Sequence, residues 1–134
     1  MNLMPVVAAA RAEASCAEIL ESWGGADGVG QVSAPAGMWP MLSAAMASDR
    51  PVLVVTATGR EADDVARRLG DFMAPEGIAT FPSWETLPHE RLSPRSDTVA
   101  TRLAVLRRLA HPDPSDPSHG PIRVVVASVR AVVQ

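Results

Sequence analysis

Short, uninterrupted apolar runs constrain the fold of this chain more than any other feature. Residues 52–55 read Val-Leu-Val-Val, and a second run covers residues 122–127. A run without alternating polar residues is typical of a strand that is buried on both faces of a parallel sheet. Segments with helical periodicity separate these runs, and strands that alternate with helices are typical of a parallel sheet with right-handed crossovers. The expected fold class is therefore α/β, with helices flanking a parallel sheet.

The same pattern of apolar runs and helical periods predicts the other elements. It predicts strands at residues 29–34, 52–55, 78–81 and 122–127. It predicts helices at residues 6–23 and 37–48, after Thr58, from Ser96 or Asp97, and after Ser128. Thr58 and Glu61 have the spacing of a capping box, in which each side chain accepts a hydrogen bond from the backbone amide of the other residue.

Four of the helices carry an apolar stripe, which predicts the face that each one buries. The predicted inward residues are Cys16, Ile19, Leu20 and Trp23 in the first helix, Met38, Leu42, Ala45 and Met46 in the second, Ala62, Val65, Ala66, Leu69 and Phe72 in the third, and Val99, Leu103, Leu106 and Ala110 in the fourth. The last helix begins after a buried strand and is short. We therefore expect the sequence to be a truncated part of a larger protein.

Composition excludes several classes of function. The net charge is −3 and all twelve basic residues are arginine, whereas a protein that binds DNA through phosphate neutralisation alone is basic. We therefore expect no strong binding of nucleic acid by this chain alone. The single cysteine, Cys16, excludes an internal disulfide and fits a reducing cytoplasm. No apolar run approaches the ~20 residues that span a bilayer, so no membrane association is expected.

The turn at residues 32–42 occupies the place of a phosphate-binding loop. Such a loop needs a lysine for the β- and γ-phosphates and a hydroxyl for Mg²⁺. If Val32 and Gly37 take the places of its first and last glycines, Met38 stands where lysine is required and Trp39 where serine or threonine is required. The loop is therefore degenerate, and no bound cofactor is expected.

Possible metal ligands and nucleophiles have structural interpretations that we favour. His111 and His119 lie with Asp113 and Asp116 in a proline-rich segment, residues 111–121, which predicts a flexible surface connection rather than a rigid metal site. Cys16 lies on the apolar face of its helix, which favours a buried structural thiol. Neither a catalytic residue nor a metal site is predicted.

The loop at residues 82–96 is the most distinctive part of the sequence. It contains three residues capable of acid–base chemistry, namely Glu85, His89 and Glu90. No nucleophile or oxyanion site accompanies them, so a structural role is favoured. In that role Trp84 and Leu87 anchor the loop in the core, and Glu85 pairs with Arg102 on the following helix, because a buried carboxylate needs a cationic partner.

Residues 81–88 read Phe-Pro-Ser-Trp-Glu-Thr-Leu-Pro, and Ser-Pro at 93–94 and Arg-Leu at 102–103 follow. This string closely resembles the N-terminal region of the bacterial transcription-repair coupling factors (Mfd). Residues 50–56 and 123–131 resemble flanking strands of the same region, and the resemblance covers residues 29–134. The motif residues, to which the resemblance gives a structural role, are Trp84, Glu85, Leu87, Pro88, Ser93, Pro94, Arg102 and Leu103.

The resemblance implies a fold and a role. Residues 25–134 would be the first subdomain of a UvrB-like module, an incomplete RecA-like (P-loop-NTPase-like) sheet with a degenerate nucleotide site. The helix in residues 1–24 would pack on another part of that module. The complete family protein displaces stalled RNA polymerase from damaged double-stranded DNA by ATP-dependent translocation and recruits excision repair through UvrA. ATP and Mg²⁺ belong to its downstream motor, so this segment would be a non-catalytic scaffold.

Two other interpretations remain open at this point. The chain could be a free-standing α/β protein that binds a nucleotide or phosphate, which would require ligand contacts without a lysine in the loop. It could also be a fragment of the repair protein UvrB, whose fold the module shares. The functional loop of UvrB would carry a lysine in the place where Met38 stands.

Overall fold

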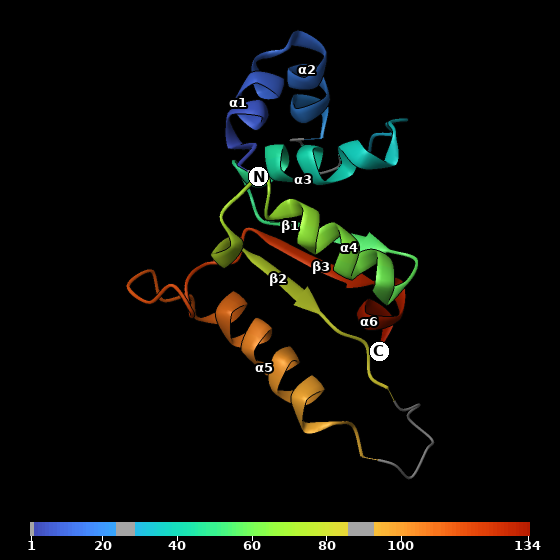
Figure 1. The fold of residues 1–134 in the computed structure, drawn as a ribbon, viewed down its shortest axis with the longest axis vertical. Coiled ribbons are helices and arrows are strands. Elements are labelled where there is room, and N and C mark those ends of the chain that lie inside the picture. The colour runs from blue at the N-terminus through green and yellow to red at the C-terminus, as the bar shows by residue number, and fades with distance from the viewer. Residues whose placement is uncertain (1, 24–28, 86–92) are drawn as a thin grey trace.

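A parallel sheet of three strands forms the centre of the molecule (Figure 1). The structure is a computed structural model, and it describes residues 2–23, 29–85 and 93–134. The strands are β1, Val52–Thr56; β2, Ile78–Phe81; and β3, Val124–Ser128. They lie in the order β1-β3-β2, and Val124 of β3 is in register with Val52 on one side and Ile78 on the other. The prediction of a parallel α/β sheet is confirmed.

Helices lie on both faces of the sheet. They are α1, Met4–Ala12; α2, Ala14–Ser22; α3, Trp39–Ala47; α4, Gly59–Leu69; α5, Ser96–Ala110; and α6, Val129–Val133, with short 3-10 helices at Ala36–Met38 and Pro75–Gly77. One core cluster joins α3 and α4 to Val124 and Val126 of β3. A second and smaller cluster lies on the opposite face, where Val105 of α5 packs with Ala79 and Val125.

The strand predicted at residues 29–34 is wrong. These residues form no regular secondary structure, and the chain passes from them into the 3-10 helix Ala36–Met38. The segment contains two valines among small and polar residues, and the side chain of Val29 is 99% exposed. It therefore gains little from burial, and propensity alone does not hold a strand without packing.

The single helix predicted over residues 6–23 is also wrong, because two helices form instead. The backbone of Glu13 is extended (φ −75°, ψ 132°) and separates α1 from α2. A Glu13 carboxylate oxygen accepts a hydrogen bond from the amide of Cys16 at 3.1 Å, and this bond lowers the pKa of Glu13. On the other side of the break, Arg11 forms an ion pair with Asp49 at 2.9 Å, which holds α1 against the end of α3. The residues predicted to face inward from the single helix, Cys16, Ile19, Leu20 and Trp23, are half-buried, and the first three belong to α2.

Helix caps agree with the sequence at two places and differ at a third. Thr58 and Glu61 form the predicted capping box, with both hydrogen bonds at 3.2 Å. Ser128 caps α6 by accepting a hydrogen bond from the amide of Ala131, as predicted. Neither Ser96 nor Asp97 caps α5, because Arg95 occupies the N-cap position and makes no side-chain capping bond.

The predicted inward faces are correct for α4 and wrong for α5. Ala62 and Leu69 of α4 are buried, and Val65, Ala66 and Phe72 are half-buried against the same cluster. In α5 the buried residues are Arg102 and Val105. The predicted Leu103 and Leu106 are 61% and 49% exposed. The helix is therefore rotated relative to the prediction, so that its arginine faces the sheet.

The two apolar runs also differ in burial. Residues of β3 are buried on both faces except Val125, which is half-buried, and this agrees with a central strand. In β1, burial alternates along the strand, and Leu53 and Val55 are about half-exposed. The prediction that residues 52–55 are buried on both faces is therefore wrong for one of those faces.

The core cluster around Leu69 gives a direct test of this packing. Leu69 is fully buried, so Leu69→Ala should lower the free energy of unfolding by about 2–5 kcal/mol through lost burial and the cavity that remains. Leu103→Ala is the matched control on an exposed helix surface and should change it by less than about 0.5 kcal/mol. Urea unfolding followed by circular dichroism measures both, and similar losses at the two positions would contradict the assignment of the core.

Candidate interaction surface and its supporting arginine

Arg102 lies where α5 meets the carboxyl end of β2. Its side chain is only 9% exposed. The guanidinium carbon is 4.1 Å from the ring centroid of Phe81 and 4.4 Å from that of Trp84. Each such contact between a cation and an aromatic ring contributes roughly 0.5–2 kcal/mol. The two rings therefore offset part of the cost of burying the charge.

Backbone carbonyls complete the surroundings of this arginine. Its Nη1 donates to the carbonyl oxygen of Pro82 at 2.7 Å and towards that of Ala131 in α6 at 3.4 Å. Burial lowers the pKa of the Arg102 guanidinium, whose ordinary value is far above neutrality, so the group stays charged. Arg102 thus connects α5, the segment after β2, and α6.

The predicted pair of Glu85 with Arg102 is wrong. Glu85 is exposed, and its carboxylate accepts hydrogen bonds from the hydroxyl of Thr98 and from the amide of Arg95. The bond from Thr98 lowers the pKa of Glu85. A carboxylate in solvent needs no cationic partner, and the aromatic rings and carbonyl oxygens surround the arginine instead. The contact with two rings leaves no signal in the sequence, because Phe81 ends β2 and Arg102 lies on α5.

The other motif residues take different places. Trp84 is half-buried against Arg102, outside both core clusters, and its amide donates to the side-chain oxygen of Gln134 at 3.0 Å. Ser93 and Pro94 are exposed before α5. The predictions for Leu87, Pro88, His89 and Glu90 fall outside the described residues.

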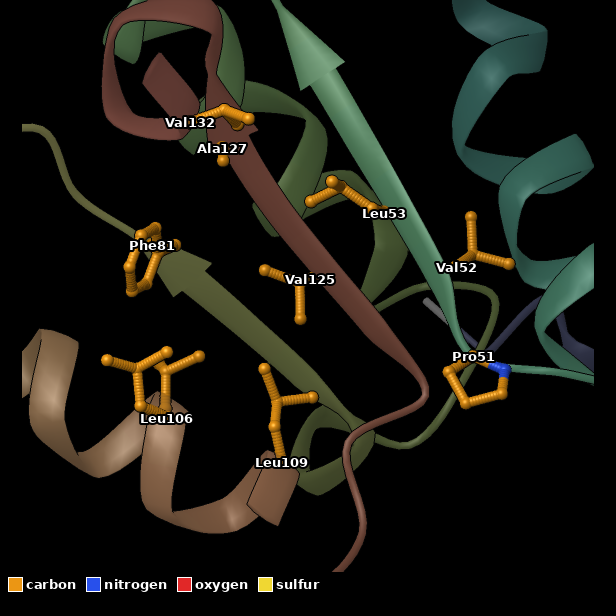
Figure 2. Close-up of a pocket in the computed structure, with 10 residues that line it drawn as sticks. Pro51, Val52, Leu53, Phe81, Leu106, Leu109, Val125, Ala127 and Val132 are labelled. Atoms are coloured by element: carbon orange, nitrogen blue, oxygen red, sulfur yellow. The ribbon is translucent and has the colours of Figure 1, made fainter. Parts of the chain in front are cut away.

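An apolar groove lies on the face of the sheet that α5 covers only in part (Figure 2). Its volume is about 360 Å³. Leu106 and Leu109 of α5 form one side, Val125 and Ala127 of β3 lie at its base, and Leu53 of β1 lies on the other side. All its lining side chains are apolar, and they are Pro51, Val52, Leu53, Phe81, Val105, Leu106, Leu109, Val125, Ala127 and Val132. The groove can exclude water from an apolar partner, but it offers no side chain for acid–base chemistry.

The residues of the predicted degenerate phosphate loop lie before and at the start of α3. Met38 and Trp39 are exposed at the start of α3, and Val32 is half-buried. A Cβ atom added to Gly37 would meet no atom within 4 Å, so nothing in the described structure requires glycine there. Cys16, predicted as a buried thiol, is half-buried beside Val32 and Met38.

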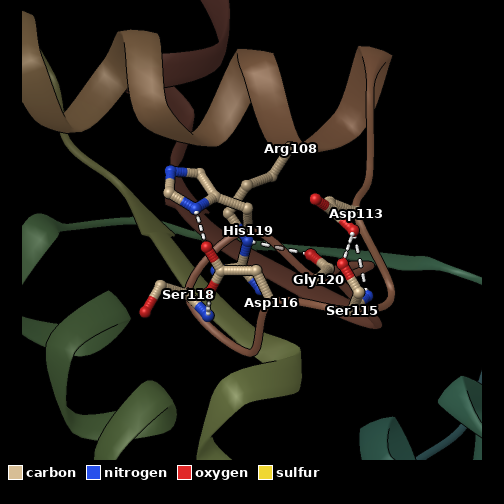
Figure 3. Close-up of polar contacts among 7 residues, drawn as sticks. All are labelled: Arg108, Asp113, Ser115, Asp116, Ser118, His119 and Gly120. Atoms are coloured by element: carbon tan, nitrogen blue, oxygen red, sulfur yellow. Dashed lines mark hydrogen bonds and ion pairs between the residues drawn. The ribbon is translucent and has the colours of Figure 1, made fainter.

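The proline-rich connection between α5 and β3 is held by specific hydrogen bonds (Figure 3). Asp113 accepts from the amide and hydroxyl of Ser115, and the His119 ring contacts the Asp116 carboxylate at 2.6 Å. The bond with His119 lowers the pKa of Asp116. Arg108 donates to the carbonyl oxygen of Gly120 at 2.9 Å, which fixes the end of the connection on α5. The prediction of a flexible connection at residues 111–121 did not include these contacts.

The described part of the chain lacks two further features. No group of three or more His, Cys, Asp or Glu residues is arranged to hold a metal ion there. Within the same residues, no helix has the length and apolar character needed to cross a bilayer.

The fold and the groove define a small parallel α/β unit with an uncovered apolar face. No family model matches the chain. It is 57% identical over 102 residues to the transcription-repair-coupling factors of Mycobacterium bovis and Mycobacterium tuberculosis, and this match covers 75% of the chain. It is 35% identical over 57 residues, or 42% of the chain, to the transcription-repair-coupling factor of Haemophilus influenzae.

These similarities relate the chain to the transcription-repair-coupling factors. The family that the motif at residues 81–103 suggested is thereby confirmed. The matched segment represents 8% of the length of each mycobacterial protein and 5% of the Haemophilus protein. The chain therefore corresponds to a small part of the curated relatives that it matches.

The surroundings of Arg102 predict a loss of stability when the cation is removed. Arg102→Met keeps a long apolar side chain but loses both ring contacts and the bonds to carbonyl oxygens, so the free energy of unfolding should fall by about 1–3 kcal/mol. Arg102→Lys should lose less because it keeps the charge. Urea unfolding measures these changes. Arg107→Met, at an exposed position of the same helix, is the control, and an equal loss there would contradict the interpretation.

The contact between Asp116 and His119 predicts a dependence on pH. The pKa of Asp116 lies below its ordinary value of 3.8, so its ionised form stabilises the fold at higher pH and this contribution disappears as the pH falls through the folded value. Asp116→Asn should therefore lower the urea midpoint at neutral pH and have a diminishing effect below about pH 4. Asp63→Asn, at an exposed position of α4, serves as the control. A difference between wild type and Asp116→Asn that is constant with pH would contradict this account.

Proposed function

We propose that this chain is a non-catalytic scaffold segment of a transcription-repair-coupling factor. The observation that carries the proposal is the 57% identity over 75% of the chain to mycobacterial proteins of that name. In this role residues 25–134 form the first subdomain of a UvrB-like module of RecA-like fold, and residues 1–24 precede it. The parallel order β1-β3-β2 with helices on both faces supports this assignment.

The activity of the complete protein forms part of the same proposal. It displaces stalled RNA polymerase from damaged double-stranded DNA by ATP-dependent translocation in the cytoplasm and recruits nucleotide excision repair through UvrA. ATP and Mg²⁺ act in the motor, at positions beyond this segment. The acidic balance of the chain supports a division in which other parts of the protein contact DNA, because phosphate contacts require basic side chains.

The degenerate loop supports the non-catalytic character of the segment. Residues 32–39 provide neither a lysine for the phosphates nor a hydroxyl at the start of α3, where Met38 and Trp39 stand. A Cβ atom added to Gly37 would meet no atom within 4 Å, so this position does not require glycine for close approach to another part of the described structure. The apolar groove lies on the face of the sheet that α5 covers, away from α3. Its apolar lining suits a protein contact rather than a nucleotide.

The function of the complete protein is tested with the gene. Its coding sequence should continue into a helicase-type motor, and the purified product should release RNA polymerase halted on DNA when ATP is added. Release requires translocation, so a variant with a disabled motor is the control. A product that lacks a motor, or that does not release the polymerase, would contradict this part of the proposal.

The absence of nucleotide affinity is tested on the chain itself. Titration calorimetry with ATP and Mg²⁺ should show no binding at micromolar concentrations, because the lysine and hydroxyl contacts are missing. The double variant Met38→Lys/Trp39→Ser restores both side-chain types and serves as a comparison. Micromolar binding by the unaltered chain would overturn the scaffold assignment in favour of a nucleotide-binding protein.

A further inference from the structure

One half of a sheet face is left without a covering layer. On the face that carries Ala79, Phe81 and Val125, helix α5 packs against β2 and leaves β1 open. Leu53 and Val55 of β1 point to this face and are 54% and 49% exposed. Parallel sheets are almost always covered on both faces, since their strands are apolar on both sides.

The width of the uncovered part of the sheet matches the diameter of one helix. Adjacent strands lie about 4.8 Å apart, so the two spacings from β2 across β3 to β1 give about 10 Å. A helix with its side chains is about 10–12 Å in diameter. A second helix beside α5 would therefore lie over β1 and β3. It would be flanked by Leu106 and Leu109 on one side and would cover Leu53 on the other (Figure 2).

The chemistry of the groove specifies the kind of helix. All of the lining side chains are apolar, and Val132 of α6 extends the apolar surface at one end. A polar face placed here would leave its hydrogen-bonding groups unpaired, at a cost in free energy. The occupant must therefore present an apolar stripe with residues at i, i+3, i+4 and i+7.

We propose that this groove holds one amphipathic helix from another part of the same longer polypeptide. This inference rests on the proposed function, in which the chain is one segment of a coupling factor. The matched segment makes up 8% of each mycobacterial relative, so those proteins contain a long polypeptide outside it. A helix on the same chain also has a high effective concentration at the groove, which favours it over a separate partner.

Photo-crosslinking in the complete polypeptide encoded by the gene tests the proposal. Benzoylphenylalanine replaces Leu106 on one side of the groove or Leu53 on the other, and mass spectrometry identifies the crosslinked peptide. Both positions should crosslink to one segment outside residues 1–134 that carries the apolar helical pattern. Leu103 is the matched control, since it is exposed on α5 but does not line the groove, and its yield of that crosslink should be several-fold lower.

The alternative outcomes each overturn the inference. They are crosslinks to a second copy of the protein, to a separate protein, or to a segment without the helical pattern, as well as equal yields at Leu103 and Leu106 or no crosslink at either groove position. ATP-driven release of halted RNA polymerase is measured on the same variants. Release without the expected crosslink would refute the docked helix and leave the proposed function intact, whereas lack of release by the unaltered protein would refute the proposed function.

Discussion

Pairing of β3 with a parallel neighbour on each side is the constraint on which the rest of the structure depends. Because β3 is central, both of its faces must be covered by apolar groups from other elements. Helices α3 and α4 cover one face through a cluster that includes Leu69, Val124 and Val126. On the other face α5 packs against Val125 and Ala79, and it covers the β2 side of the sheet. The apolar groove is the direct result of this unequal coverage.

The rotation of α5 follows from the same arrangement. A helix that covers one edge of the sheet has one side toward β2 and another beside the open strands. Arg102 occupies the side toward β2. Its guanidinium packs against the rings of Phe81 and Trp84 and donates a hydrogen bond to the carbonyl oxygen of Pro82. Leu106 and Leu109 then lie beside the open strands and line the groove. An arginine in the sheet interface thus places leucines on a surface where an apolar partner can reach them.

The sequence predicted the features that depend on local chemistry or on strong apolar runs. The three strands found, the capping box of Thr58 and Glu61, and the inward face of α4 have such signals and were confirmed. The strand predicted at residues 29–34 does not form, because a weakly apolar segment gains little from burial. The break at Glu13 and the inward face of α5 depend on tertiary contacts, of Arg11 with Asp49 and of Arg102 with two rings, which a helical period does not reveal.

The division of polar and apolar surface explains why a docking role fits this molecule better than a chemical one. Acidic side chains that could have served as ligands or bases are engaged in local structure. Glu13 and Glu61 cap helices, Glu85 joins the start of α5, and Asp113 and Asp116 hold the connection before β3. A group used in this way loses internal hydrogen bonds if it turns to a ligand, and this cost reduces any gain in binding. The apolar side chains around the groove have no such competing contacts, so covering them by another part of a protein brings a net gain from burial.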